Sequence, residues 1–212
     1  MYFFNFNTDN NEYSQRFDFT TQNDSLIFPI QSNFLFSSEN MTDSSNINEI
    51  NKKHLELLSS KNDFFVNLLL HTDFEDGMDN KAIAFVEKNI NENVFATYLW
   101  LSNLYNLYSR IHEYDMNRNL ILAGILRIFS YISGNSYLRS IEPTLLGLIK
   151  SALSDSNLVV KEAGVMVIEE LRDKESLELL KQFNFKGTLI EKYVKTVTKE
   201  LEEELDSVEH CA

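Results

Sequence analysis

The stretch PTLLGLIKSALSDSNLVVKEAG, residues 143–164, is the part of this chain that says most about its fold. Pro143 stands where the first turn of a helix tolerates a missing N–H. Ser154, Asp155, Ser156 and Asn157 form a run of residue types that favour turns and helix starts. The apolar residues on both sides recur at three- and four-residue spacing, which is typical of amphipathic helices. The stretch therefore predicts two helices joined by a short turn.

This pattern is the second of two copies, and the first copy lies 40 residues earlier in the chain. At that offset Asp115 falls on Asp155, and the same alignment matches four apolar or small residues of the following helix: Leu120 with Val160, Ala123 with Ala163, Gly124 with Gly164 and Ile128 with Ile168. A period near 40 is typical of arrays in which each helix pair must stack on a neighbour to bury its apolar face. The two Ala-Gly pairs predict close approach between helices, since Gly inside a helix otherwise costs about 1 kcal/mol.

The second copy also resembles a known repeat family. Pro143, Asp155, Val160, Lys161 and Ala163 form the pattern P-x11-D-x4-V-K-x-A, which looks like a HEAT repeat. The resemblance implies that Asp155 and Lys161 stabilise the ladder between repeats and that Pro143 and Ala163 are structural positions. The copy at 96–133 departs from the pattern, because Ile121 replaces the basic residue and no proline opens its first helix. A copy at 75–90 is weaker still.

Helical periodicity runs from about Asn46 to the end of the chain. We predict helices over 46–59, 62–71, 79–90, 94–112, 117–133, 141–153, 157–171, 175–183 and 187–207. The expected fold is mainly α, a short right-handed α-solenoid of HEAT-like helix pairs over residues 46–212.

Residues 1–45 form a separate N-terminal segment by composition. Eight of the sixteen Phe residues fall there, among Asn, Ser, Thr and Asp. Alternation with a period of two, as in residues 4–6 and 17–20, favours short strands or extended structure over helices.

Charge limits the classes of partner. The 212 residues include 19 basic and 32 acidic side chains, which gives a formal net charge of -13. Nucleic acid and anionic lipid are bound through clustered Lys and Arg, so neither is expected as a partner. An acidic protein speeds its encounter with a basic partner, and we therefore expect another protein, of basic character.

Targeting and cysteine signals favour a soluble, cytoplasmic protein. Cys211 is the single cysteine, so neither an intramolecular disulfide nor a four-cysteine zinc site can form. No apolar run reaches the roughly 18 residues that span a bilayer. The start MYFFNFNTDN lacks the basic region of a signal peptide.

Residues suited to catalysis or metal binding are sparse. The four histidines, at 54, 71, 112 and 210, lack the two-His spacing of a zinc site. Residues 71–77 resemble part of a calcium loop, but Gly77 comes one position early and Ala84 stands where a Glu should be. His112 and Glu113 with Asp115 could form an acid–base pair, although charged turn residues are more often only hydrated. We predict no enzyme, catalytic residue, metal site or cofactor.

Two groups of side chains are candidates for partner binding. Tyr105, Tyr108 and Tyr114 belong to a predicted helix that is apolar nearly all round, so a core role and an interface role are both open to them. Glu169, Glu170 and Asp173 lie where charges alternate in sign at helical spacing, a pattern that more often marks a solvated face.

Three functions are compatible with this sequence. The favoured one is a noncatalytic protein–protein interaction module with an acidic face, and a more specific version is an immunity or antitoxin-type protein that binds a basic partner. The second is a helical enzyme or ligand carrier with an apolar pocket near Tyr98–Tyr114. The third, a HEAT-like nucleic-acid binder, is disfavoured by the charge.

Overall fold

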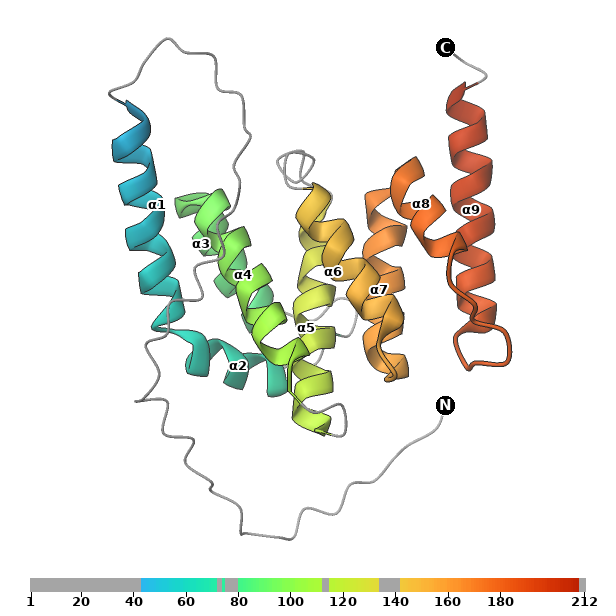
Figure 1. Cartoon of the computed structure of the whole chain (residues 1–212), viewed down its shortest axis with the longest axis horizontal. Helices are drawn as coiled ribbons and strands as arrows, with labels where there is room; N and C mark the ends of the chain where they lie inside the picture. Colours follow the sequence, from blue (N-terminus) through green and yellow to red (C-terminus); the bar gives the residue numbers. More distant parts are fainter. Residues whose placement is uncertain (1–42, 72–73, 75–79, 112–114, 134–141, 210–212) are drawn as a thin grey trace, which may run out of the picture. The chain divides into compact units, whose positions relative to one another are not determined.

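Figure 1 shows the computed structural model of the chain, which divides into two units, Met1–Glu39 and Asn40–Ala212. The structure describes residues 43–71, 74, 80–111, 115–133 and 142–209, all of them in the second unit. These residues form helices and no strand: α1 (Asp43–Ser59), α2 (Asn62–Leu70), α3 (Lys81–Glu92), α4 (Val94–Ser109), α5 (Met116–Ser133), α6 (Glu142–Ser154), α7 (Leu158–Leu171), α8 (Lys174–Lys181) and α9 (Glu191–Glu209).

The prediction of a mainly α fold is confirmed. Each predicted helical span overlaps one observed helix, and the ends differ by four residues at most, at the start of α9. The predicted extended segment, 1–45, lies outside the described residues as far as residue 42, and residues 43–45 belong to α1 rather than to a strand.

Asn and Asp side chains set several of the helix starts. Asn80 accepts hydrogen bonds from the backbone N–H groups at the start of α3, and Asn93 and Asn157 do the same for α4 and α7. Asp173 caps α8 in the same way. Such caps satisfy backbone donors that have no partner inside the helix, so the boundaries follow from local chemistry.

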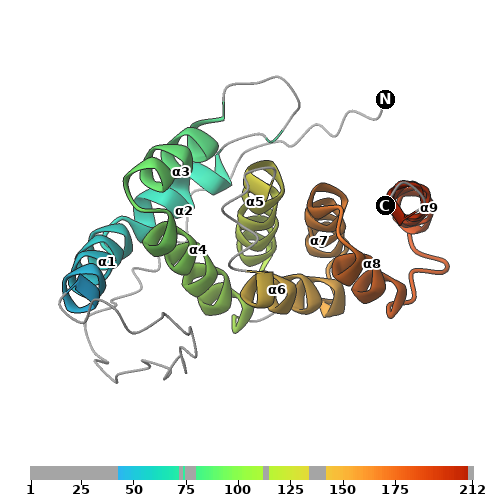
Figure 2. The ribbon, with the colours of Figure 1, turned by 90° about the horizontal axis from the view of Figure 1, so that it is seen from above.

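The later helices alternate between two rows. In Figure 2, α5, α7 and α9 are seen nearly end on in one row, and α4, α6 and α8 lie in a second row beside them. The most extensive contact joins α5 to α7, while α6 packs on α7 and α4 packs on α5. Successive helix pairs therefore bury their apolar faces against one another.

The core runs through α4, α5 and α7. Its largest fully buried side chains include Trp100, Tyr98, Tyr105 and Phe129. The rings of Tyr98 and Phe129 lie 5.0 Å apart between centroids, which joins α4 to α5. The Trp100 indole N–H donates a hydrogen bond of 2.7 Å to the Asn62 side chain, so its polar atom is satisfied.

Candidate partner interface

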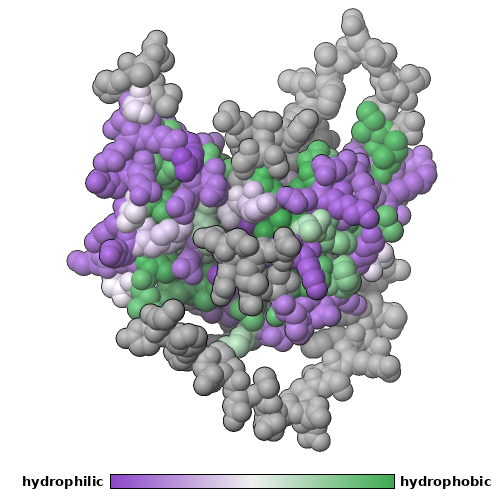
Figure 3. All heavy atoms as spheres, turned by 180° about the vertical axis from the view of Figure 1, so that it is seen from behind, coloured by the Kyte–Doolittle hydropathy of each residue, from purple (hydrophilic) through white to green (hydrophobic). Residues whose placement is uncertain are grey.

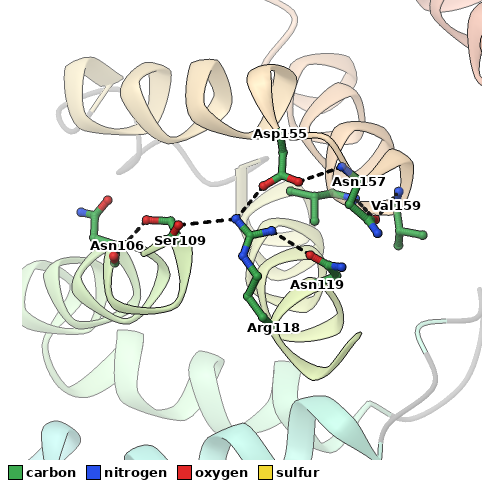
Figure 4. A network of polar contacts seen from close by, with 8 residues as sticks. Asn106, Ser109, Arg118, Asn119, Asp155, Asn157 and Val159 are labelled. Atoms are coloured by element: carbon green, nitrogen blue, oxygen red, sulfur yellow. Dashed lines mark hydrogen bonds and ion pairs between the residues drawn. The ribbon is translucent and has the colours of Figure 1, made fainter. Parts of the chain in front are cut away.

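A buried ion pair joins α5 to the turn between α6 and α7 (Figure 4). An Nη atom of Arg118 lies 2.7 Å from a carboxylate oxygen of Asp155, and these side chains are only 3% and 6% exposed. The other Nη of Arg118 donates to the Asn119 side chain at 2.7 Å. The second oxygen of Asp155 accepts from the Asn157 N–H at 2.8 Å. The Arg118 side chain on α5 thus links one helix pair, α4 and α5, to the next pair, α6 and α7.

The same turn geometry recurs 40 residues earlier. Asp115 accepts a hydrogen bond from the Asn117 N–H at 2.8 Å, which matches the bond between Asp155 and Asn157 in length and spacing. Both bonds are Asx turns at the start of a helix. The offset found in the sequence therefore aligns the two Asx turns, although α5 begins directly after Asp115 and α7 begins three residues after Asp155.

Sequence reasoning missed Arg118. The resemblance implied a basic residue at position 121, where the chain has Ile. Arg118 lies three residues earlier and so on nearly the same face of α5, which is the signal that could have identified it. The basic residue of the other copy, Lys161, is half-buried on α7.

The predicted structural positions lie on the helices of the second copy. Pro143 is the second residue of α6, and Ala163 is buried on α7. A Cβ added to Gly164 would come within 3.0 Å of the Ala152 Cβ on α6. A Cβ on Gly124 would come within 3.1 Å of Leu69 on α2. The predicted close approach is confirmed at both glycines, but the helices they approach are not equivalent.

The three candidate tyrosines differ in exposure. Tyr105 is 1% exposed, and burial raises its pKa to about 12, against the opposing effect of a hydrogen bond with Ser151. A side chain so placed is part of the core, so Tyr105 is corrected from a partner contact to a core residue. Tyr108 is half-buried; burial, aided by nearby carboxylates, raises its pKa. Tyr114 lies outside the described residues.

The three candidate acidic residues also have different surroundings. Glu170 is exposed on α7, whereas Glu169 accepts a hydrogen bond from the Tyr193 hydroxyl of α9. Burial is the main cause that raises the pKa of Tyr193, and the hydrogen bond to Glu169 raises it further. Asp173 is half-buried and accepts from the Ser176 N–H at 2.7 Å as the cap of α8. Glu170 is therefore the candidate whose carboxylate is free to meet a partner without loss of one of these contacts.

A small hollow opens between α7 and α9. Its lining combines charged side chains with two buried apolar ones: Glu169, Arg172, Glu200 and Glu204 with Val197 and Leu201. Its volume of about 60 Å³ is far below the roughly 300 Å³ at which small-molecule sites begin. Its size therefore excludes a drug-sized ligand, while its rim carries three carboxylates and one guanidinium.

Lysines offset part of the negative charge around this hollow. Lys181 lies 3.1 Å from Glu178 and 3.0 Å from Glu202, and these hydrogen bonds raise its pKa. Twelve acidic and eight basic side chains occur between residues 158 and 207, so an acidic excess remains. Figure 3, which views the helices from behind, shows mostly hydrophilic side chains at the edge of the second unit where α9 lies. Glu170 on α7 and Glu200 on α9 are exposed, and we call the surface that α7 and α9 form around the hollow the α7–α9 acidic face.

The other sequence candidates form no evident site. In the described parts of the chain, no three His, Cys, Asp or Glu side chains lie close enough together to hold a metal ion. Most of the calcium-loop-like segment, 71–77, and the pair His112 and Glu113 lie outside the described residues. Among the helices described, none is long and apolar enough to cross a bilayer.

Comparison with family models, curated proteins and solved structures finds no match to this chain.

Proposed function

We propose that this chain is a noncatalytic protein-binding module, a short right-handed α-solenoid of HEAT-like helix pairs that binds a basic partner protein. The two rows of helices and the shared Asx turns at Asp115 and Asp155 support the repeat architecture. Arrays of this kind offer extended surfaces to other macromolecules.

The observation that carries the proposal is the α7–α9 acidic face. Its exposed carboxylates include Glu200, which lines the hollow, and Glu170, which follows the lining residue Glu169 in α7. A lysine or arginine of a partner can direct its charged group at such exposed carboxylates. The chemistry of this face therefore suits a protein that presents basic side chains.

The more specific form of the proposal is an immunity or antitoxin-type role. Such a protein works by occupying a basic partner, so it requires an acidic surface and no chemistry of its own. The acidic net charge of the chain also increases the rate of encounter with such a partner.

The test is capture of partners from the source cell, followed by kinetics with each purified partner. Wild type is compared with the double variant Glu170→Lys/Glu200→Lys. Both residues are exposed, whereas a change at Asp173 would also remove the cap of α8. We expect the variant to associate about tenfold more slowly at low salt and with a weaker salt dependence.

The matched control is Glu56→Lys/Glu87→Lys, which changes the net charge equally at exposed positions of α1 and α3. It should associate with the partner nearly as fast as wild type does. Equal slowing by both double variants would show that net charge alone matters, and equal binding by all three proteins would exclude the α7–α9 acidic face as the binding surface.

A further inference from the structure

Two neighbouring helices expose apolar side chains at the same end. Met116 and Leu120 on α5 are 71% and 42% exposed, and Val159 on α7 is 37% exposed. Met116 and Leu120 are four residues apart, so they share one face of α5. The hydrogen bond between Arg118 and Asp155 holds the first turn of α5 beside the start of α7. The three apolar side chains therefore lie at one end of the α5–α7 contact.

The exposed side chains of α5 and α7 also point to the same side. Arg118 points toward the turn between α6 and α7 (Figure 4), and Leu120 lies about 160° from it around the axis of α5. Gly164 faces α6, and Val159 lies about 140° from it around the axis of α7. Leu120 and Val159 are therefore both directed away from the row that contains α4 and α6 (Figure 2).

Carboxylates lie next to this apolar group. Glu170 follows Val159 by eleven residues, which is about three turns, so the two share one face of α7. Glu162 follows Val159 by one turn and is half-buried. Asp115, directly before α5, is exposed. The apolar group is thus continuous along α7 with the α7–α9 acidic face.

Two nearby basic side chains leave this acidic character in place. Arg127 shares the face of α5 with Leu120, but its guanidinium lies over the Phe74 ring, 5.8 Å from the centroid. Lys161 follows Val159 by two residues and so lies about 160° from it around the axis of α7. Lys161 therefore does not point to the side on which Val159 is exposed.

This combination matches one kind of partner segment. An apolar side chain of the partner can bury the exposed parts of the three apolar residues, while basic side chains on either side of it meet the carboxylates. Protein interfaces combine a buried apolar centre with a polar rim in this way. The unbranched side chain of Met116 can adapt its shape to such a contact.

We propose that Met116, Leu120 and Val159 form the apolar anchor of the partner interface, and that the segment bound there presents a large apolar side chain flanked by lysine or arginine. The inference rests on the proposed function, to which it adds an apolar centre. The two parts of the surface have separable effects, because exposed charges mainly set the rate of association and buried apolar contacts mainly set the rate of dissociation.

Three synthetic helical peptides of equal length serve as probes: one of leucine and lysine, one of serine and lysine, and one of leucine and glutamate. The full chain should bind the leucine–lysine peptide at least about tenfold more tightly than the serine–lysine peptide, and should not bind the leucine–glutamate peptide. NMR spectra of the full chain should show the leucine–lysine peptide shifting the methyl resonances of Met116, Leu120 and Val159.

The decisive variant is Met116→Ser/Leu120→Ser. The leucine–lysine peptide should dissociate from it about tenfold faster than from wild type, with nearly unchanged association. Met116→Ser alone, at the most exposed of the three positions, should raise the dissociation rate about threefold, and it keeps the test valid if the double variant does not fold. The matched control is Ile47→Ser/Ile50→Ser, at side chains of α1 that are 56% and 54% exposed, and it should behave as wild type does.

Three results would overturn the anchor. They are unchanged dissociation from the Met116 variants, equally fast dissociation from the α1 control, and binding of the serine–lysine peptide as tight as that of the leucine–lysine peptide. The acidic face is tested separately with Glu170→Lys/Glu200→Lys, which should slow association of the same peptide. Unchanged association with this variant would count against the proposed function, whichever result the anchor variants give.

Discussion

Tyr98 places a hydroxyl in the core without a hydrogen-bond partner. The residue is 1% exposed on α4, and its ring packs on Phe129. The same burial raises its pKa, because the phenolate form cannot be solvated there. Tyr98 thus contributes apolar contacts through its ring and a desolvation cost through its hydroxyl.

We expect Tyr98→Phe to raise the free energy of unfolding at pH 7 by about 1 kcal/mol, because the substitution removes the unsatisfied hydroxyl. The folded-state pKa of Tyr98 lies above its unfolded value of about 10, so the unfolded state loses this proton first as the pH rises. Wild type should therefore lose more stability than the variant between pH 9 and pH 11. Urea unfolding at pH 7, 9 and 11 measures both effects.

The control is Tyr131→Phe, at a side chain that is 59% exposed, and it should change stability by less than about 0.5 kcal/mol. A clear loss of stability in Tyr98→Phe at pH 7 would mean that the hydroxyl has a partner in solution.

At the scale of the helix, glycine has two opposite roles in the second helix pair. Gly147 is exposed within α6, and no atom lies within 4 Å of the Cβ that an alanine would add. Gly164 lies within α7 against α6, where the added Cβ would meet the Ala152 Cβ at 3.0 Å. Gly147 therefore lowers the helix propensity of α6 without allowing a close contact. Gly164 allows α6 and α7 to approach each other closely.

The two alanine substitutions should accordingly change stability in opposite directions. Gly147→Ala should raise the free energy of unfolding by about 1 kcal/mol through helix propensity. Gly164→Ala should lower it by about 1–3 kcal/mol, because a methyl group on one rigid backbone meets a methyl group on another. Chemical denaturation of each variant measures the difference, and equal gains at both positions would mean that α6 and α7 can separate freely.

Across the whole second unit, the helices differ in how completely they are surrounded. α5 contacts α2, α3, α4 and α7, whereas α1 packs mainly on α4 and α9 on α7 and α8. Exposed apolar side chains remain on α1, where Ile47, Ile50 and Leu57 are each half exposed or more. Stability should therefore fall from the middle of the array toward its two ends.

Native-state hydrogen exchange measures this gradient. Amides of residues 122–129 in α5 should exchange only through global unfolding, while those of α1 and α9 should exchange at least about a hundredfold faster through local opening. Protection of α1 equal to that of α5 would contradict the gradient and would show that another surface covers the α1 side chains.

Local sequence patterns were enough to predict the helical class, the approximate span of each helix and the turns at Asp115 and Asp155. These features depend on residues within about four positions of one another, such as apolar spacing and the Asn and Asp caps. The sequence also predicted helix contacts at Gly124 and Gly164, because glycine lowers helix propensity and is expected inside a helix where a neighbouring helix must approach closely. The α-solenoid and the basic partner stay predictions.

The burial of particular side chains and the pairing of particular charges became evident only from the packed helices. The packing assigned Tyr105 to the core, made Asp173 a helix cap, and joined Arg118 to Asp155 across 37 residues of chain. A helix that is apolar nearly all round does not reveal which of its faces is covered, and an ion pair between distant residues has no local pattern. Such contacts depend on how whole helices pack, since the burial and the distances that define them exist only after the chain has folded.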